Sequence, residues 1–334
     1  MLESATSVQD IVEKHGPWTA MCIGLGDGQY TLTPARADSR LRRLVQIVAD
    51  LSRKPLNQLR VLDLACLEGH YGIEFARQGS RVVGIEIREA NLAKANFAKH
   101  RLGLGNIDFV QDDVRNLSKS RYGTFDVAIC SGILYHLTTP DVFEFAGKIF
   151  EVCDHLAIID THFALYDKQT VEHRGKRYSG LYYREHSENA TAQEKYEDLW
   201  ASLENTSSFW LTHASLCNLM AHVGFSSLYE CHNPSGADQH DDRKTYVAIK
   251  SSRAAILTSP QTDGMVDTDW PEHHPRRVAP VHLLTEQPVR RFFKSALPQP
   301  LKNVIKPVLR ALRLLEPDGT PAWRRKQLKA AERG

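Results

Sequence analysis

Three acidic side chains lie at the ends of apolar runs, at spacings that could hold a nucleoside. Asp63 opens the segment Asp63-Leu-Ala-Cys-Leu-Glu-Gly69, whose small residues let the backbone approach a ligand closely. Glu86 ends the next apolar run, 17 residues beyond Gly69, where its carboxylate can accept hydrogen bonds from ribose hydroxyls. Asp113 follows a third run. The pattern predicts a site for a nucleoside at the ends of successive strands.

The turn after the first run is poorly suited to phosphate groups. It lacks the G-x-G-x-x-G pattern that seats a pyrophosphate on a helix N-terminus, and the carboxylate of Glu68 would repel a phosphate there. We therefore expect a nucleoside without phosphates. This expectation disfavours NAD and favours S-adenosylmethionine.

Strands that alternate with helices must position these side chains. Apolar runs predict strands at residues 60–66, 81–86, 107–111, 125–130 and 155–160, with helices over 35–55, 71–78, 89–100 and 141–150. Such alternation predicts an α/β fold with a doubly wound, mostly parallel sheet that binds ligands beyond the carboxyl ends of its strands. A helix over 212–223 and strands at 225–231 and 244–250 add an antiparallel terminal hairpin and bring the sheet to seven strands.

Four segments in this order and spacing resemble the class I S-adenosylmethionine-dependent methyltransferases. They are VLDLACLEGHYG, GIEIREANLAKA, FVQDDV and FDVAICSGILYHL. The resemblance covers roughly residues 36–160 and the closing SLCNLMAHVGFSSL…TYVAIK, and it implies a Rossmann-like methyltransferase fold. The family turn is D-x-G-x-G-x-G, and here Ala65 and Leu67 occupy the first two glycine places. We expect the backbone of Leu67 to keep a negative φ and its side chain to line the adenosine pocket.

The resemblance implies a role for each residue of the predicted cofactor site. Asp63 would orient the turn and bind the methionine amino group, Gly69 would pass against the cofactor, and Glu86 would hold the ribose. Asp113 would accept from the adenine amino group, with Asp112 as the less favoured holder of that role. The predicted cofactor-binding residues are Asp63, Ala65, Leu67, Gly69, Glu86, Asp113, Val114, Ser131 and Gly132. The bland alternative is that these acids only cap turns and helices.

Methyl transfer to an oxygen nucleophile needs alignment, exclusion of water and a base. His136, in the segment Leu134-Tyr-His-Leu137, is a candidate base, and Asp160 and His162 follow the fifth strand. A histidine in such a loop can instead serve only to fix the loop by hydrogen bonding. The chain has no HExxH motif and no paired Cys and His spacing, so no metal site is expected.

Three segments lie outside the alternating core. Residues 1–35 are expected to form an N-terminal lid segment whose Ile23–Thr31 stretch is a turn. The polar insert 161–208, rich in Tyr and His, is too long for an ordinary connection and is expected to bind the acceptor. Residues 251–299 are expected to be a poorly ordered linker before a basic amphipathic tail over 300–334. The methyltransferase domain itself is expected to span 36–250.

Charge divides the chain into an acidic front and a basic tail. Residues 251–334 hold 15 Lys and Arg against 8 Asp and Glu, whereas residues 1–250 hold 27 against 32. An acidic core weighs against a broad nucleic-acid-binding face, since backbone binding depends on positive charge. The tail permits contact with a membrane surface, a partner protein or a second copy of the chain. No 18-residue apolar run, no secretory pattern and six scattered cysteines predict a cytoplasmic protein.

The leading hypothesis is therefore a methyltransferase that acts on a small-molecule or carbohydrate-like acceptor, at a hydroxyl oxygen. One alternative is an enzyme similar to the tRNA wobble-uridine-modifying methyltransferases, which share the ILYH-type loop. Another is a non-catalytic binding protein that retains the fold.

With 42% hydrophobic and 25% charged residues, the composition excludes a wholly disordered chain.

Overall fold

The structure is a computed structural model of the 334-residue chain, and it describes residues 7–19, 22–32, 39–232, 242–252 and 269–270. Residues 1–272 and 273–334 form two separate units, and every described residue belongs to the first. The predicted tail over 300–334 lies outside the described residues, as does the predicted linker over 251–299 except for residues 251–252 and 269–270.

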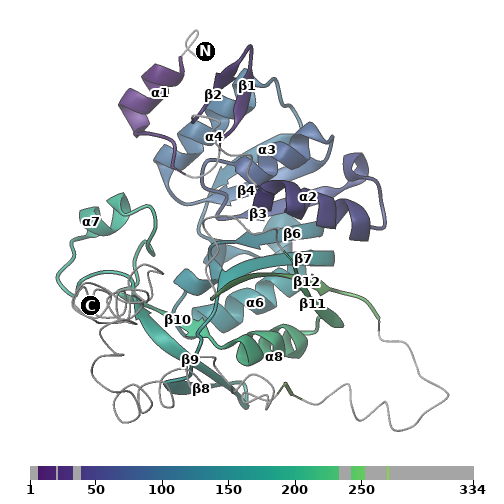
Figure 1. Ribbon diagram of the computed structural model, residues 1–334, viewed down its shortest axis with the longest axis vertical. Helices are drawn as coiled ribbons and strands as arrows, with labels where there is room; N and C mark the ends of the chain where they lie inside the picture. The colour runs from purple at the N-terminus through teal and green to yellow at the C-terminus, as the bar shows by residue number, and fades with distance from the viewer. Residues whose placement is uncertain (1–6, 20–21, 33–38, 233–241, 253–268, 271–334) are drawn as a thin grey trace, which may run out of the picture. The chain divides into compact units, whose positions relative to one another are not determined.

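A seven-stranded sheet forms the centre of the first unit, in the order β11-β12-β7-β6-β3-β4-β5. Its strands are β3 (Arg60–Leu64), β4 (Arg81–Glu86), β5 (Ile107–Gln111), β6 (Phe125–Ser131), β7 (Cys153–His162), β11 (Ser227–Cys231) and β12 (Arg243–Ile249). The first five are parallel, while β12 runs antiparallel to both β7 and β11. The predicted mostly parallel sheet with an antiparallel terminal hairpin is confirmed (Figure 1).

Helices cover both faces of this sheet, and each face has its own apolar core. On one face pack α2 (Ser39–Leu51), α3 (His70–Arg77) and α4 (Glu89–Arg101), and on the other pack α6 (Asp141–Val152) and α8 (His213–Val223). The spacing predicts this burial: Leu44, Ile47 and Val48 lie on one side of α2 and are buried. Short helical turns η1 (Leu56–Gln58), η2 (Val114–Asn116), α5 (Lys119–Tyr122) and η3 (Leu134–His136) complete the connections.

The insert contains a second sheet that the sequence analysis does not predict. Strands β8 (Gln169–His173), β9 (Lys176–Arg184) and β10 (Ser207–Leu211) pair antiparallel in the order β10-β9-β8. The two-residue turn Arg174-Gly175 joins β8 to β9 with positive φ at both positions, as type I′ hairpins require. Between β9 and β10 the chain forms the short helix α7 (Ala192–Glu197).

The N-terminal segment packs beside α4. It contains helix α1 (Val8–His15), which is not among the predicted helices. Strands β1 (Gly24–Gly26) and β2 (Gln29–Tyr30) form a short hairpin within the segment Ile23–Thr31, which is predicted as a turn. A buried ion pair ties this segment down: Lys94 Nζ lies 2.7 Å from Glu68 Oε1 and donates to the carbonyl of Pro17 at 3.0 Å. The backbone N–H of Thr19 also donates to Glu68. Glu68 therefore anchors the N-terminal segment.

Asp269 and Trp270 contact α8. The side-chain amide of Asn218 forms hydrogen bonds with the backbone of Trp270, and Nε2 of His222 lies 2.6 Å from Oδ1 of Asp269.

Among the described helices, none has the length and apolar character needed to cross a bilayer.

Candidate functional site

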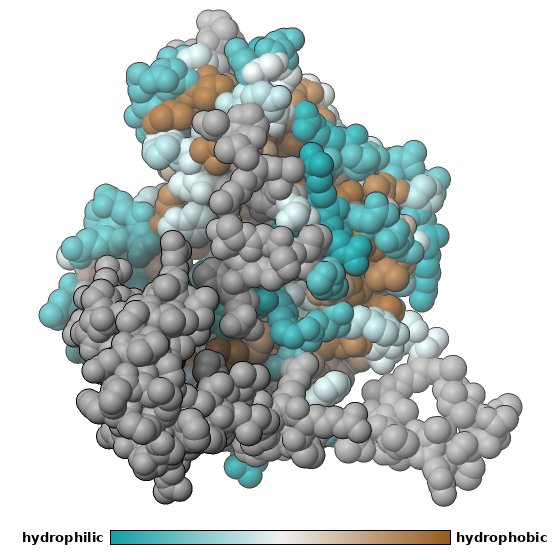
Figure 2. Space-filling view, viewed as in Figure 1, coloured by the Kyte–Doolittle hydropathy of each residue, from teal (hydrophilic) through white to brown (hydrophobic). Residues whose placement is uncertain are grey.

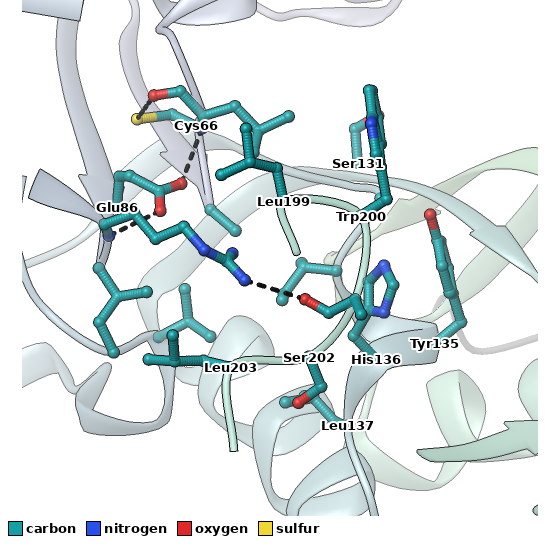
Figure 3. Close-up of a pocket in the computed structure, with 18 of the residues that line it drawn as sticks. Cys66, Glu86, Ser131, Tyr135, His136, Leu137, Leu199, Trp200, Ser202 and Leu203 are labelled. Atoms are coloured by element: carbon teal, nitrogen blue, oxygen red, sulfur yellow. Dashed lines mark hydrogen bonds between the residues drawn. The ribbon is translucent and has the colours of Figure 1, made fainter. Parts of the chain in front are cut away.

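A pocket of about 540 Å³ opens at the carboxyl ends of β3, β4, β5 and β6. The turns that follow these strands form one wall, and residues 199–205 of the insert form another. Every predicted cofactor residue lines it except Gly69, and of the three predicted catalytic residues only His136 does. Figure 3 shows the pocket with Glu86 on one side and His136 on the other.

The turn after β3 corrects one prediction. Leu67 has a φ of 48° and Ala65 a φ of 51°, so both adopt the left-handed conformation and the expected negative φ of Leu67 is wrong. Such a conformation costs a non-glycine residue about 1–2 kcal/mol. Here the N–H of Leu67 donates to Glu86 Oε2 at 2.9 Å, which holds the turn in place. Ala65 and Leu67 thus adopt, at the first two glycine places of the family pattern, the positive φ that glycine favours.

Asp63 is buried at the base of this turn. Its Oδ2 accepts a hydrogen bond of 2.8 Å from the N–H of Gly72, at the start of α3. Burial raises the pKa of Asp63 to about 7, opposed by the Gly72 hydrogen bond and reinforced by the nearby charge of Glu86. The pocket therefore contains a carboxyl group whose charge changes near neutral pH.

Glu86 ends β4 and is 2% exposed. Its two oxygens accept from the backbone N–H groups of Arg88 and Leu67, each at 2.9 Å. Burial raises the pKa of Glu86 despite these hydrogen bonds and the nearby Arg88 charge. Both hydrogen bonds fix the carboxyl group in one orientation at the rim of the pocket.

The two aspartates after β5, Asp112 and Asp113, differ in their hydrogen-bond partners. Asp112 is buried and bonded to Asn116, Tyr122 and the N–H of Asp113. Burial opposes its ionisation, but these hydrogen bonds and Arg121 hold its pKa below the ordinary value. Asp113 accepts from the N–H of Arg115 at 2.8 Å and from its guanidinium. Both aspartates line the pocket beside Val114.

Ser131 and Gly132 lie where β6 ends. Gly132 has a φ of 85°, and its N–H donates to the carbonyl of Asp160 at 2.9 Å. The hydroxyl of Ser131 donates to that of Tyr71 at 3.3 Å. The turn at Ser131 and Gly132 lines the pocket and leads into η3, which carries His136.

His136 forms a pair with a carboxylate from the insert. Its Nδ1 lies 3.0 Å from both oxygens of Glu185, whose side chain is 2% exposed. Burial alone would raise the pKa of Glu185, but the hydrogen bonds from His136 and from the N–H of Ser202 lower it. Because an ionised carboxylate can only accept, we assign a proton to Nδ1, so that in the neutral imidazole Nε2 is the unprotonated nitrogen. No described residue has a hydrogen bond to Nε2.

The other two candidate bases are engaged elsewhere. Asp160 is 1% exposed and accepts from Arg243 at 2.7 Å and 2.6 Å and from Thr245. Nδ1 of His162 lies 3.0 Å from Asp242, and its ring stacks on Trp210. Neither residue lines the pocket. This geometry makes Asp160 the ion-pair partner of Arg243 and argues against a base at either position.

Several pocket residues are absent from the sequence-based site. Glu185, Arg88, Arg243 and residues 199–205 either line the pocket or contact a side chain that does. Glu185 lies 49 positions from His136 in the chain, and a spacing of that length carries no signal. Arg88 stands two residues after Glu86, and this closeness is the one sequence signal that could have found it. The described residues contain no group of three or more His, Cys, Asp or Glu side chains placed to hold a metal ion.

Comparisons with known proteins agree with this geometry. Residues 61–155 match the family model described as a methyltransferase domain. The chain is 27% identical over 175 residues to a tRNA U34 carboxymethyltransferase of Colwellia psychrerythraea, covering 52% of each chain. It is 35% identical over 89 residues to a ubiquinone biosynthesis O-methyltransferase of Hahella chejuensis, covering 26% of this chain and 37% of that protein. The chain thus spans about half the length, or less, of these curated relatives.

A solved structure matches over more of the chain. The N-terminal domain of EvdMO1, solved in the presence of SAH and D-fucose, superposes with a TM-score of 0.57 at 22% identity. The match covers 73% of this chain and 96% of that domain. Residues 61–155 therefore belong to a methyltransferase domain, and the fold around them is that of the class I S-adenosylmethionine-dependent methyltransferases, as the motifs predict.

Proposed function

We propose that this protein transfers a methyl group from S-adenosylmethionine to a hydroxyl oxygen of a small-molecule or carbohydrate-like acceptor. The observation that carries the proposal is the pocket itself. Asp63, Glu86 and Asp113 line one cavity at the carboxyl edge of the parallel sheet, together with His136. Ligands of open α/β sheets bind at this edge.

The residues of the pocket fit an adenosyl donor. Its volume of about 540 Å³ lies within the range of about 300–1,000 Å³ that is common for small-molecule sites. Glu86 and Asp113 supply carboxylate acceptors for ribose hydroxyls and the adenine amino group, while Asp63 supplies negative charge for a cationic ligand. A phosphate-bearing ligand would meet these carboxylates at close range, which disfavours a dinucleotide.

The chain's own residues account for the rest of the reaction. When bound, the cofactor supplies an electrophilic methyl group on a sulfonium leaving group. His136 takes the hydroxyl proton of the acceptor at Nε2, and Glu185 holds the imidazole in that tautomer and stabilises the imidazolium that forms. Residues 199–205 cover the pocket and exclude water.

Binding and transfer can be tested separately. Calorimetric titration with S-adenosylmethionine and S-adenosylhomocysteine tests the cofactor site, and neither ligand binding would favour a non-catalytic protein. Transfer of a labelled methyl group to a panel of free sugars, glycosides and phenols tests the acceptor. D-fucose belongs in the panel because the structural neighbour was solved in its presence. Phenols belong there because the Hahella relative is a ubiquinone biosynthesis O-methyltransferase.

Replacing Glu86 by glutamine should raise the dissociation constant for S-adenosylhomocysteine by about 10–100-fold. The change removes a charged hydrogen-bond acceptor, a group worth roughly 1.5–3 kcal/mol. Calorimetry measures the effect, and Asp108→Asn, at an exposed position on β5, is the matched control. Equal affinities for Glu86→Gln and wild type would mean that the ribose is held elsewhere.

Cofactor affinity should depend on pH through Asp63. Its pKa of about 7 lies above the ordinary 3.8, so the folded protein keeps a proton that must leave before Asp63 can pair with the ammonium group of the ligand. Affinity for S-adenosylhomocysteine should therefore be about tenfold weaker at pH 6 than at pH 8. The same shift means that the contribution of Asp63 to the stability of the ligand-free protein is lost as pH rises from about 4 to about 7. Both trends should vanish in Asp63→Asn, and their persistence would assign them to another group.

A tRNA-modifying enzyme is the second candidate. The 27% identity over 175 residues to a tRNA U34 carboxymethyltransferase favours it. The excess of Asp and Glu in residues 1–250 weighs against it, because tRNA binding requires a basic groove. Retention of tRNA that weakens steeply with salt would favour this candidate over a small-molecule acceptor.

A further inference from the structure

We propose that residues 196–205 form a mobile lid over the pocket and that Arg88 is the latch that holds this pocket lid closed. The inference rests on the proposed function, because the lid would control entry and release of the cofactor. Arg88 would act as a positioning residue: it touches the lid and Glu86, and it works through them.

The first observation is how Arg88 is bonded. Its guanidinium donates to three backbone carbonyls of the lid: Tyr196 at 3.2 Å, Asp198 at 2.9 Å and Ala201 at 3.1 Å. The residue is only 7% exposed. Its own N–H donates to Glu86 Oε1, so one residue connects the lid to the carboxyl group proposed for ribose binding.

The second observation is that the lid also contacts the proposed base. The N–H of Ser202 donates to Glu185 at 3.0 Å, and the amide of Asn205 donates to the carbonyl of His136 at 3.1 Å. Figure 3 shows Leu199 between Glu86 and His136, with Trp200 above His136 and Ser202 below it. One segment therefore forms a wall of both the cofactor side and the base side of the pocket.

The third observation is that polar contacts, and not a core, hold the lid in place. None of residues 196–205 is fully buried, and Trp200 is 63% exposed. Helix α7, which leads into the lid, has no buried residue, and its surface in Figure 2 is hydrophilic. Segments with few buried apolar contacts open at low free-energy cost. A closed lid of this kind depends on such polar contacts: Arg88 makes three of them to the backbone, and Arg115 adds one to the side chain of Glu204 at 2.7 Å.

The test compares Arg88→Lys with wild type, using S-adenosylhomocysteine as the probe. Lysine keeps the positive charge beside Glu86 but cannot reach three carbonyls at once. We expect the probe to dissociate about 10-fold faster and to associate faster as well, since both steps pass through the open lid. Stopped-flow mixing measures the two rates. Arg184→Lys, at an exposed position of β9 where the arginine pairs with Glu188, is the matched control.

Hydrogen exchange separates a latch from a purely structural role. In wild type, the probe should slow exchange of residues 196–205 and of the turn 63–69. In Arg88→Lys, protection of the turn should remain while protection of the lid is lost. Unchanged rates with a fully protected lid would overturn the latch. Wild-type protein that binds no probe would instead overturn the proposed function, and the latch with it.

Discussion

The His136→Ala variant should turn over its acceptor about 10²–10⁴-fold more slowly than wild type, while its affinity for S-adenosylhomocysteine stays the same. General-base catalysis contributes an effect of this size, and the proposed base contacts the acceptor rather than the cofactor. Initial rates of labelled methyl transfer, measured on the acceptor that the panel identifies, give kcat and KM. Glu185→Gln should also lower kcat, because a neutral amide no longer fixes the tautomer of His136 or stabilises its protonated form.

Two controls distinguish a catalytic base at His136 from a histidine that only fixes its loop. His100→Ala, at an exposed position of α4, should retain wild-type turnover. Added imidazole should restore part of the activity of His136→Ala, since a small base can occupy the space that the side chain leaves. A His136→Ala enzyme with wild-type kcat would show that the histidine only fixes its loop.

The Arg243→Met variant should lose about 3–5 kcal/mol of unfolding free energy. Arg243 donates twice to Asp160, which is 1% exposed, and removing it leaves this buried carboxylate with the more distant guanidinium of Arg40, 3.9 Å away, in place of a close partner. Denaturant unfolding followed by circular dichroism measures the loss. The double variant Arg243→Met with Asp160→Asn should recover part of it, because the second change removes the stranded charge.

Lys244, the residue after Arg243, offers a matched control. Lys244 pairs with Glu230 at the surface, where the two side chains are 24% and 38% exposed. Exposed pairs contribute about 0–1 kcal/mol, so Lys244→Met should change stability little. Equal losses for Arg243→Met and Lys244→Met would mean that the Arg243 pair has no special role in the fold.

The sequence predicts the central sheet well because local pattern and topology agree there. Asp63, Glu86 and Asp113 each follow an apolar run, and parallel strands bring their carboxyl ends to one edge. That geometric rule alone gathers residues 50 positions apart into a single pocket. The helices predicted over 89–100 and 141–150 likewise agree with α4 and α6 to within about two residues.

Other features depend on contacts between distant parts of the chain. Leu67 adopts a left-handed conformation that its side chain disfavours, and the hydrogen bond to Glu86 that stabilises it is invisible in local sequence. Glu185 reaches His136 only because the insert folds into its own sheet. That sheet escapes prediction since its turn, Arg174-Gly175, is not one of the strong hairpin signals.

The most direct test of the account is a crystal structure of the full chain with S-adenosylhomocysteine. We predict the ribose hydroxyls on Glu86, the adenine beside Asp112, Asp113 and Val114, and residues 199–205 closed over the ligand. A ligand bound away from this pocket, or a Glu86 carboxylate turned away from the ribose, would contradict the account.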